Sequence, residues 1–513
     1  MECRLTEWRW CLAALVLATV ARAVAAEPRG VRDRPNVVLI MADDLGVGDL
    51  GCYGQQLIQT PRIDRMAVEG VRFTQAYAGA PVCAPSRCVL MTGLHAGHAR
   101  IRDNSGRVGG VADEMSGSGH RIPLLDEDLT VAEVLKQAGY ATGITGKWGL
   151  GEAGTTGEPT RQGFDEWYGF LNQNHAVDHF PDHLWHDGRR VIVEENRDGG
   201  RSRYANDLFA EFAIDFIRRH RGHPFFLYLP FTIPHADLEV PSQEPYADRD
   251  WPEDSKTVAA MVTRMDRDVG RLLDLLAELG LERNTLVLFT SDNGSPEAGG
   301  PLLCSNGGLR GRKGSLHEGG LRVPMIARWP GRVAAGAVND EPCTFADLLP
   351  TLAELADARL PVAVDGVSIA ATLAGDPQDL AGRFLYWERP APKFQQAARR
   401  GRFKALRAGR HTPLQLFDLG VDPGEACDVA AEHPDVVAAF DDFLATAREA
   451  SPHWPDPPPD DAHDAAARDA AHDAAGDGHA RSSSAGEPGR PSPARAESSP
   501  AERPPSTTRL PNA

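Results

Sequence analysis

Cys83, Pro85 and Arg87 lie close together in a stretch, 81–93, whose residue types could carry out chemistry. Pro85 suits the first position of a helix, and the apolar run Val89–Met91 continues that helix inward. Cys83 would then stand at a helix N-terminus, where free N–H groups and the helix dipole favour an anion. Arg87 could add a fork of donors to the same anion. Position alone fits a nucleophile beside an oxyanion site and a buried structural cysteine about equally well.

Carboxylate and amide side chains follow two predicted strands. The apolar, β-branched run 35–42 is typical of a strand buried on both faces of a parallel sheet, and Asp43 and Asp44 follow it. A similar run later in the chain ends before Asp292 and Asn293. Buried carboxylates need a positive partner, although a solvated loop with two acids is the alternative. Three carboxylates and an amide form a hard oxygen set, which favours Ca²⁺ or Mg²⁺ over zinc.

Three basic side chains also lie at places where they could reach a cleft. Lys147 follows the predicted strand 141–145, and His235 follows the predicted strand 225–229. Ligands of open α/β sheets bind outside the carboxyl ends of the strands, so these residues are expected to meet the acidic ones. A lone lysine between glycines is more often a surface charge, and the glycine-rich loop around Lys313 would by itself be a solvated turn.

The order Cys83-x-Pro85-Ser86-Arg87, followed by Met91-Thr92-Gly93, resembles the signature of the type I sulfatases, which belong to the alkaline-phosphatase-like superfamily. In that family a maturing enzyme oxidises the cysteine to Cα-formylglycine, whose hydrated aldehyde is the nucleophile. The resemblance therefore implies hydrolysis of a sulfate ester at Cys83. A sulfated carbohydrate is the expected substrate.

The resemblance also implies a role for each matching residue. Arg87, Lys147 and Lys313 would neutralise the sulfate oxygens, and His235 or Lys313 would protonate the departing alcohol. Calcium is implied as the metal, with Mg²⁺ less favoured. Its implied ligands are Asp43, Asp44, Asp292, Asn293 and the modified Cys83.

Gly149 departs from the family pattern. Sulfatases carry Gly-Lys-Trp-His-Leu-Gly where this chain has Gly146-Lys147-Trp148-Gly149-Leu150-Gly151, and they use that histidine to handle the proton when the covalent sulfate ester breaks. The histidine-rich stretch 172–185 resembles that of bacterial glycan sulfatases that also have glycine here. His175 is therefore the expected substitute, with an ordinary surface histidine as the alternative.

Composition limits the other classes of function. The chain has 513 residues, of which 42% are hydrophobic and 25% charged, which is ordinary for globular proteins. A net charge of −18 without a basic stripe argues against nucleic-acid binding, and an anionic substrate must be met by a local positive pocket. No segment after the N-terminal one is long and apolar enough for a membrane span.

The chain divides into a leader, two folded parts and a tail. Residues 1–26 resemble a signal peptide, with an uncleaved anchor as the alternative, so the protein is expected to be secreted or periplasmic. Residues 27–380 would form the catalytic domain, 381–450 a small C-terminal subdomain, and 451–513 a disordered tail poor in apolar side chains. The pairing of the remaining cysteines cannot be read from the sequence.

The expected fold is an α/β fold with a large, mixed but mostly parallel central sheet flanked by helices, as in the alkaline-phosphatase-like superfamily. Strands near 384–387, 403–406 and 414–419 would form a small antiparallel sheet, with a helix at 436–447. Two other functions stay open. One is a phosphate or phosphonate ester hydrolase of the same superfamily, and the other is a sulfated-glycan binding protein that has lost turnover through Gly149.

Overall fold

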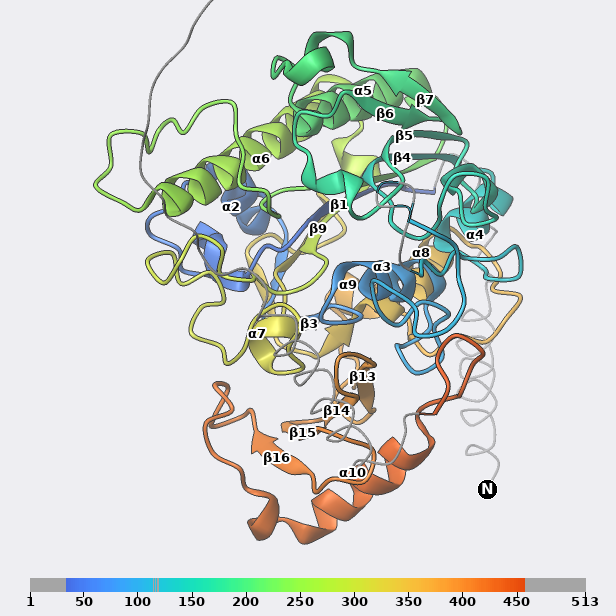
Figure 1. Cartoon of the computed structure of the whole chain (residues 1–513), viewed down its shortest axis with the longest axis vertical. Helices are drawn as coiled ribbons and strands as arrows, with labels where there is room; N and C mark the ends of the chain where they lie inside the picture. Colours follow the sequence, from blue (N-terminus) through green and yellow to red (C-terminus); the bar gives the residue numbers. More distant parts are fainter. Residues whose placement is uncertain (1–33, 114, 116, 118–119, 457–513) are drawn as a thin grey trace, which may run out of the picture. The chain divides into compact units, whose positions relative to one another are not determined.

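The computed structural model describes residues 34–113, 115, 117 and 120–456 (Figure 1). The signal peptide expected at 1–26 and the part of the expected tail from 457 onward lie outside the described residues. Within the described ranges, no helix combines the length and the apolar character that crossing a membrane requires.

A ten-stranded mixed sheet forms the centre of the described part of the chain (Figure 1). The central strands β9, β1, β8, β4 and β5 run parallel, and β10, β6 and β7 pair in the antiparallel sense. In spatial order the strands are β11 (Ala337–Asn339), β2 (Val71–Phe73), β10 (Met325–Arg328), β9 (Thr285–Ser291), β1 (Asn36–Ala42), β8 (Phe225–Pro230), β4 (Ala141–Lys147), β5 (Glu166–Phe170), β6 (His183–His186) and β7 (Arg189–Ile192).

Helices cover both faces of this sheet, and β1 contributes to both layers because its side chains alternate. Val37 and Leu39 pack in one core, whereas Val38 and Ile40 pack in the other. The first layer contains α3 (Cys83–Thr92), α4 (Val131–Gln137), α8 (Leu348–Leu355) and α9 (Ala370–Ala374), and the second contains α2 (Pro61–Val68), α5 (Ala205–His220) and α6 (Glu253–Glu278). The expected strand at 35–42, buried on both faces, is thereby confirmed.

The end of α2 and the start of α3 depend on particular residues. The helix α2 ends at Val68, and β2 follows it. The chain turns at Gly70, where a Cβ would lie 2.2 Å from the carbonyl oxygen of Ala327, so only glycine allows this close approach to β10. The helix expected to begin at Pro85 begins at Cys83, which places the cysteine inside its first turn.

A four-stranded antiparallel sheet and a helix form the C-terminal part of the fold. The strands are β13 (Leu385–Arg389), β14 (Gln395–Arg400), β15 (Phe403–Arg407) and β16 (Gln415–Asp418), and α10 (Pro434–Thr446) covers one face. The other face packs on α7 (Glu318–Leu321) and on β3 (Ala76–Tyr77), which pairs with β12 (Cys343–Thr344). The expected mixed sheet with a small antiparallel sheet is confirmed, although the sequence did not predict β14.

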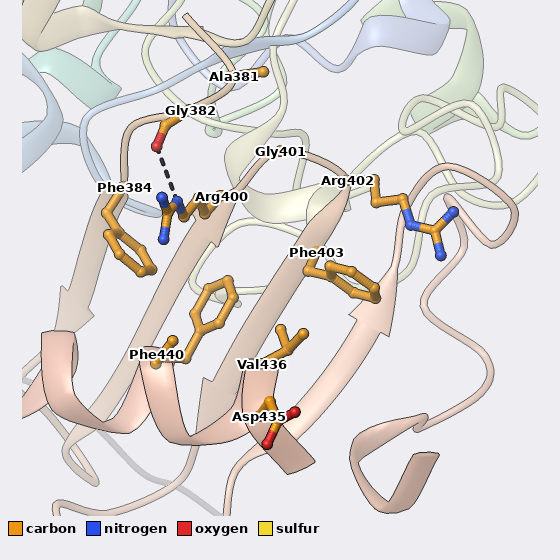
Figure 2. A pocket seen from close by; sticks show the side chains of 11 residues that line it. Ala381, Gly382, Phe384, Arg400, Gly401, Arg402, Phe403, Asp435, Val436 and Phe440 are labelled. Atoms are coloured by element: carbon orange, nitrogen blue, oxygen red, sulfur yellow. Dashed lines mark hydrogen bonds between the residues drawn. The ribbon is translucent and has the colours of Figure 1, made fainter. Parts of the chain in front are cut away.

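A groove of about 520 Å³ lies between the small sheet and α10 (Figure 2). Phe384, Phe403 and Phe440 line it, and the Arg400 side chain donates to the carbonyl oxygen of Gly382 over 2.9 Å (Figure 2). None of the residues predicted to carry out chemistry lines this groove.

Candidate active site

The carboxyl ends of three parallel strands bring the predicted site residues together. Asp43 and Asp44 follow β1, Asp292 and Asn293 follow β9, and Lys147 is the last residue of β4. All five side chains are buried. Asp44 has a positive φ of 70°, a backbone conformation that Asp and Asn adopt more readily than most residues, and this turn directs the chain out of β1.

Cys83 lies at the start of α3, next to this edge of the sheet. Its side chain is 1% exposed, and its Sγ is 3.6 Å from Oδ1 of Asp43. Burial raises the pKa of the Cys83 thiol to about 12. Because the thiolate and not the thiol is the nucleophile, the unmodified cysteine is not an activated one at neutral pH.

Cationic side chains bind each carboxylate of the site. Arg87 donates from Nε and Nη2 to Oδ2 of Asp292, over 3.1 and 2.8 Å. Lys147 Nζ donates to Oδ2 of Asp43 over 2.6 Å. The Arg87 guanidinium also donates to the carbonyl oxygen of Lys147 over 2.7 Å, so α3 and β4 are joined directly at the site.

Two further cationic groups reach the site from loops. Lys313 Nζ donates to Oδ2 of Asp44 over 2.8 Å, and Nε2 of His235 lies 3.7 Å from the same oxygen. Lys313 is therefore not the solvated turn residue that its loop alone would suggest. Arg87, Lys147, Lys313 and His235 all come together with the acidic residues, as predicted.

The charges shift the ionisation of these groups in opposite directions. Burial opposes ionisation of Asp43, but the charges of Lys147 and His235 hold its pKa well below the usual value. Burial and the nearby carboxylate of Asp43 raise the pKa of Asp292. Burial disfavours the charged form of Lys313, yet the facing Cys83 and Asp44 raise its pKa. A cation placed among the carboxylates would stabilise the ionised form of Asp292.

The residues at this edge fit a divalent metal ion. Asp43, Asp44, Cys83 and His235 each present one atom that lies within 4.8 Å of the others. Oδ1 of Asn293 is buried without a hydrogen-bond partner among the described residues, and Nδ2 of the same amide donates to Oδ1 of Asp44 over 2.6 Å. An unpartnered amide oxygen beside carboxylate oxygens is a donor set suited to Ca²⁺ or Mg²⁺.

His175 is not brought to this cluster. Its buried ring lies with its centroid 4.8 Å from that of Phe170 and 4.3 Å from that of His183. Burial, followed by the charge of His183, lowers the pKa of His175 to about 3. The ring therefore packs as a neutral core side chain among the described residues.

The space next to Gly149 is occupied by Gln173, which was not among the predicted site residues. A Cβ at Gly149 would lie 2.0 Å from Nε2 of Gln173. Gln173 reaches this position because β4 and β5 pair in parallel and the backbone N–H of Gly149 donates to the carbonyl oxygen of Leu171 over 3.1 Å. This pairing brings the residues just after β5 to Gly149.

Comparisons with known proteins relate most of the chain to one family. The model of the sulfatase family matches residues 35–358, and the model of the C-terminal part of N-sulphoglucosamine sulphohydrolase matches residues 312–449.

Curated relatives include steryl-sulfatase of Mus musculus, which is 34% identical over 83% of this chain and 84% of its own length. N-acetylgalactosamine-6-sulfatase of Sus scrofa is 35% identical over 81% of this chain and 85% of its own length. Among solved structures, the crystal structure of Ps i-CgsB in complex with k-i-k-neocarrahexaose has a TM-score of 0.71 and 30% identity, and the match covers 84% of this chain and 96% of that one.

Proposed function

The chain belongs to the sulfatase family and is a sulfuric ester hydrolase, and we propose that it acts on a sulfated carbohydrate through a formylglycine formed from Cys83. The overall reaction converts a sulfate ester and water into an alcohol and sulfate. The observation that carries the proposal is the convergence of Arg87, Lys147 and Lys313 on a carboxylate cluster beside Cys83.

The balance of charge in the site supports binding of an anion once a metal ion is present. Three carboxylates face three permanently cationic side chains, so these charges nearly cancel. A bound divalent ion would leave a positive surplus in a buried site, where electrostatic attraction to a sulfate ester is strong. The residues in this balance are Asp43, Asp44, Asp292, Arg87, Lys147 and Lys313.

Ca²⁺ is the ion that we assign to Asp43, Asp44, Asp292 and Asn293, and when bound it would polarise an oxygen of the substrate and one on residue 83. A formylglycine-generating enzyme is the partner required to mature Cys83. Since burial keeps the Cys83 thiol protonated, the aldehyde hydrate is better suited to attack than the thiol.

The other side chains bind and orient the substrate. Arg87, Lys147 and Lys313 donate hydrogen bonds to the sulfate oxygens and stabilise the charge that develops on them. His235 holds a proton at Nε2 for the oxygen of the departing alcohol, with Lys313 as the second donor that can reach it. The burial of Arg87 and Lys147 excludes bulk water from their side of the site.

Two further parts of the proposal, a carbohydrate substrate and an exported location, are supported by other observations. N-acetylgalactosamine-6-sulfatase of Sus scrofa is named for a sulfated sugar, and the structure of Ps i-CgsB contains a neocarrahexaose. The leader at 1–26 supports export to the periplasm or the outside of the cell, where extracellular glycans are found.

A panel of sulfated mono- and disaccharides, assayed with the matured protein beside matched phosphate esters, tests the proposal. We expect sulfate release from at least one sugar, a preference for sulfate over phosphate, and loss of turnover in Cys83→Ala. The mass of the tryptic peptide 73–87 reports conversion of Cys83. Full activity of Cys83→Ala, or an unconverted cysteine in active protein, would contradict the proposed nucleophile.

A further inference from the structure

Gln173 occupies the place next to Gly149 that a larger side chain at position 149 would need. A Cβ at Gly149 would lie 2.0 Å from Nε2 and 2.8 Å from Cδ of Gln173. Gly149 also has a φ of +78°, which L side chains rarely adopt. The Gln173 amide therefore occupies space that is available only because residue 149 has no side chain.

The backbone around Gln173 is fixed from both sides by one carboxylate. Asn172 and Asn174 each donate from Nδ2 to Oδ2 of Asp113 over 3.0 Å. Asp113 in turn accepts from Nε of Arg121 over 2.8 Å. A side chain between two such anchors is held in a defined direction, which is the condition for precise hydrogen bonding to a ligand.

The amide of Gln173 is a buried donor without a partner. Gln173 is 8% exposed, and its Nε2 has no hydrogen-bond partner among the described residues. A buried N–H that stays unpaired costs about 1–3 kcal/mol. A buried donor of this kind is free to bind a water molecule or a ligand.

The cavity at this amide lies beside the first turn of α3, which carries Cys83. Ala84, the residue after Cys83, lines it together with Asn104, Gly149 and Gln173, and its volume is about 10 Å³. That volume is roughly what one oxygen-sized group requires. The Oδ1 atom of Asn104 is already hydrogen-bonded, because it accepts from the backbone N–H of Ala84 over 2.9 Å.

We propose that Gln173 is a catalytic residue that donates a hydrogen bond from Nε2 to an oxygen of the sulfate group bound at residue 83, an inference that rests on the proposed sulfatase function. Gln173, and not His175, then takes the place of the histidine missing at Gly149. An amide does not titrate near neutral pH, so it stabilises charge and transfers no proton. The proton is left to groups such as His235.

Gln173→Leu tests this role by replacing the amide with an apolar side chain that is one atom shorter and has no donor. We expect kcat to fall about a hundredfold, as for loss of one oxyanion donor, with a smaller change in KM. Gln173→His should restore part of kcat and add a limb to the pH–rate profile near pH 6.5, the usual pKa of imidazole. Gln173→Glu should lower kcat further, because it places a carboxylate beside sulfate.

Gln162→Leu is the matched control, since it removes another buried glutamine. Nε2 of Gln162 donates to the carbonyl oxygens of Leu125 and Thr156 over 3.2 and 2.9 Å, so its N–H groups, unlike those of Gln173, are bonded within the protein. We expect a lower Tm for this variant and an unchanged kcat per folded, formylglycine-containing molecule. Tm and the mass of the peptide 73–87 are measured for every variant.

Calorimetry with inorganic sulfate separates the two possible failures. Weaker sulfate binding by Gln173→Leu and Gln173→Glu than by the unchanged protein supports the contact even if no sulfated sugar in the panel is hydrolysed. Absence of turnover on every sulfate ester would overturn the proposed function alone. Unchanged kcat and unchanged sulfate affinity in folded Gln173→Leu would overturn the role of Gln173.

Discussion

Asn293 contributes two different contacts from one amide. Nδ2 donates to Asp44 and to the carbonyl oxygen of Gly294, while Oδ1 stays buried without a partner among the described residues. The donor half thus fixes the orientation of the acceptor half. A metal ion bound at the strand ends would contact Oδ1 of Asn293 in an orientation that is already fixed, so binding would cost little side-chain entropy.

Replacement of Asn293 by leucine should therefore weaken metal binding. We expect affinity for Ca²⁺, measured by calorimetry, to fall by about tenfold or more, because a ligand and the contact that orients Asp44 are both lost. Asn306→Leu is the control, since Asn306 accepts from the N–H and donates to the carbonyl of Ser295. An Asn293→Leu protein that binds Ca²⁺ as tightly as before would remove Asn293 from the ligand set.

Residues at strand ends could be predicted because the fold determines where they lie. Asp43 and Asp292 follow buried parallel strands, and Lys147 is the last residue of another. Any parallel sheet brings such ends to one edge. His175 and Gln173 lie beyond β5 in a loop, where packing against neighbours sets the direction of each side chain. Two residues apart in the sequence, they lie in different environments, and no pattern in the sequence distinguishes them.

The short helix α7 connects the small sheet to the loop that carries Lys313. Lys404 of β15 lies between Glu318 of α7 and Glu425, with Nζ 2.9 and 3.0 Å from their carboxylates, and all three side chains are fully buried. Glu425 also accepts from the backbone N–H of Glu318 over 2.7 Å. The small sheet therefore holds the start of α7 in place, a few residues after Lys313.

Lys404→Met should destabilise the fold by about 3–5 kcal/mol, because it removes the one cation that two buried carboxylates share. Urea unfolding gives this value directly. Lys136→Met serves as the control, since its ion pair with Asp165 is nearly half-exposed and its loss should cost no more than about 1 kcal/mol. Equal losses of unfolding free energy in Lys404→Met and Lys136→Met would contradict a stabilising role for the buried ion pairs of Lys404.

Glu425 should make stability depend on acid pH. Burial opposes its ionisation, but Lys404 and His317 lower its pKa to about 2. Because the folded pKa lies below the unfolded value of about 4.3, Glu425 contributes stability above that pH, and the contribution is lost as the pH falls towards 2. Denaturation of the unchanged protein and of Glu425→Gln should show a difference in unfolding free energy that shrinks over this range. A constant difference would contradict the shift.

At the level of elements, β1, β8 and β9 were predicted because each is a continuous apolar run, whereas β14 was not predicted. β14 was missed because it reads Gln395-Gln396-Ala397-Ala398-Arg399-Arg400, which lacks the β-branched alternation typical of a strand. Its alanines pack in the two cores on either side of the small sheet, so neighbouring strands stabilise what local preference does not.

For the whole molecule, the ordered chain continues past the boundary at 450 that composition indicated. Trp454 is fully buried, and its Nε1 donates to the carbonyl oxygen of Arg100 over 2.6 Å. Arg448 donates to the carbonyl oxygen of Trp454 over 2.7 Å. One aromatic side chain at the end of a polar segment thus joins the C-terminal part of the fold to the loop after α3.

Trp454→Ala should lower stability by about 3–5 kcal/mol, the usual cost of removing a buried aromatic side chain. Thermal unfolding measures the change, and Pro452→Ala at a neighbouring exposed position should change stability by no more than about 0.5 kcal/mol. As a second test, a chain ended after Asp456 should unfold at a higher temperature than one ended after Ala450. Equal Tm values for these two chains would contradict the anchoring role.

The burial of Cys83 limits when in biosynthesis the proposed oxidation to formylglycine could take place. With 1% of its surface exposed, the side chain is out of reach of any modifying enzyme once the fold has closed. Arg87 and its partner Asp292 are separated by 205 residues, so the ribosome needs about 10–40 s to add the second after the first. The proposed conversion of the thiol to formylglycine must therefore take place before folding closes the site, which cannot happen until Asp292 has been added, and protein that folds first stays unconverted.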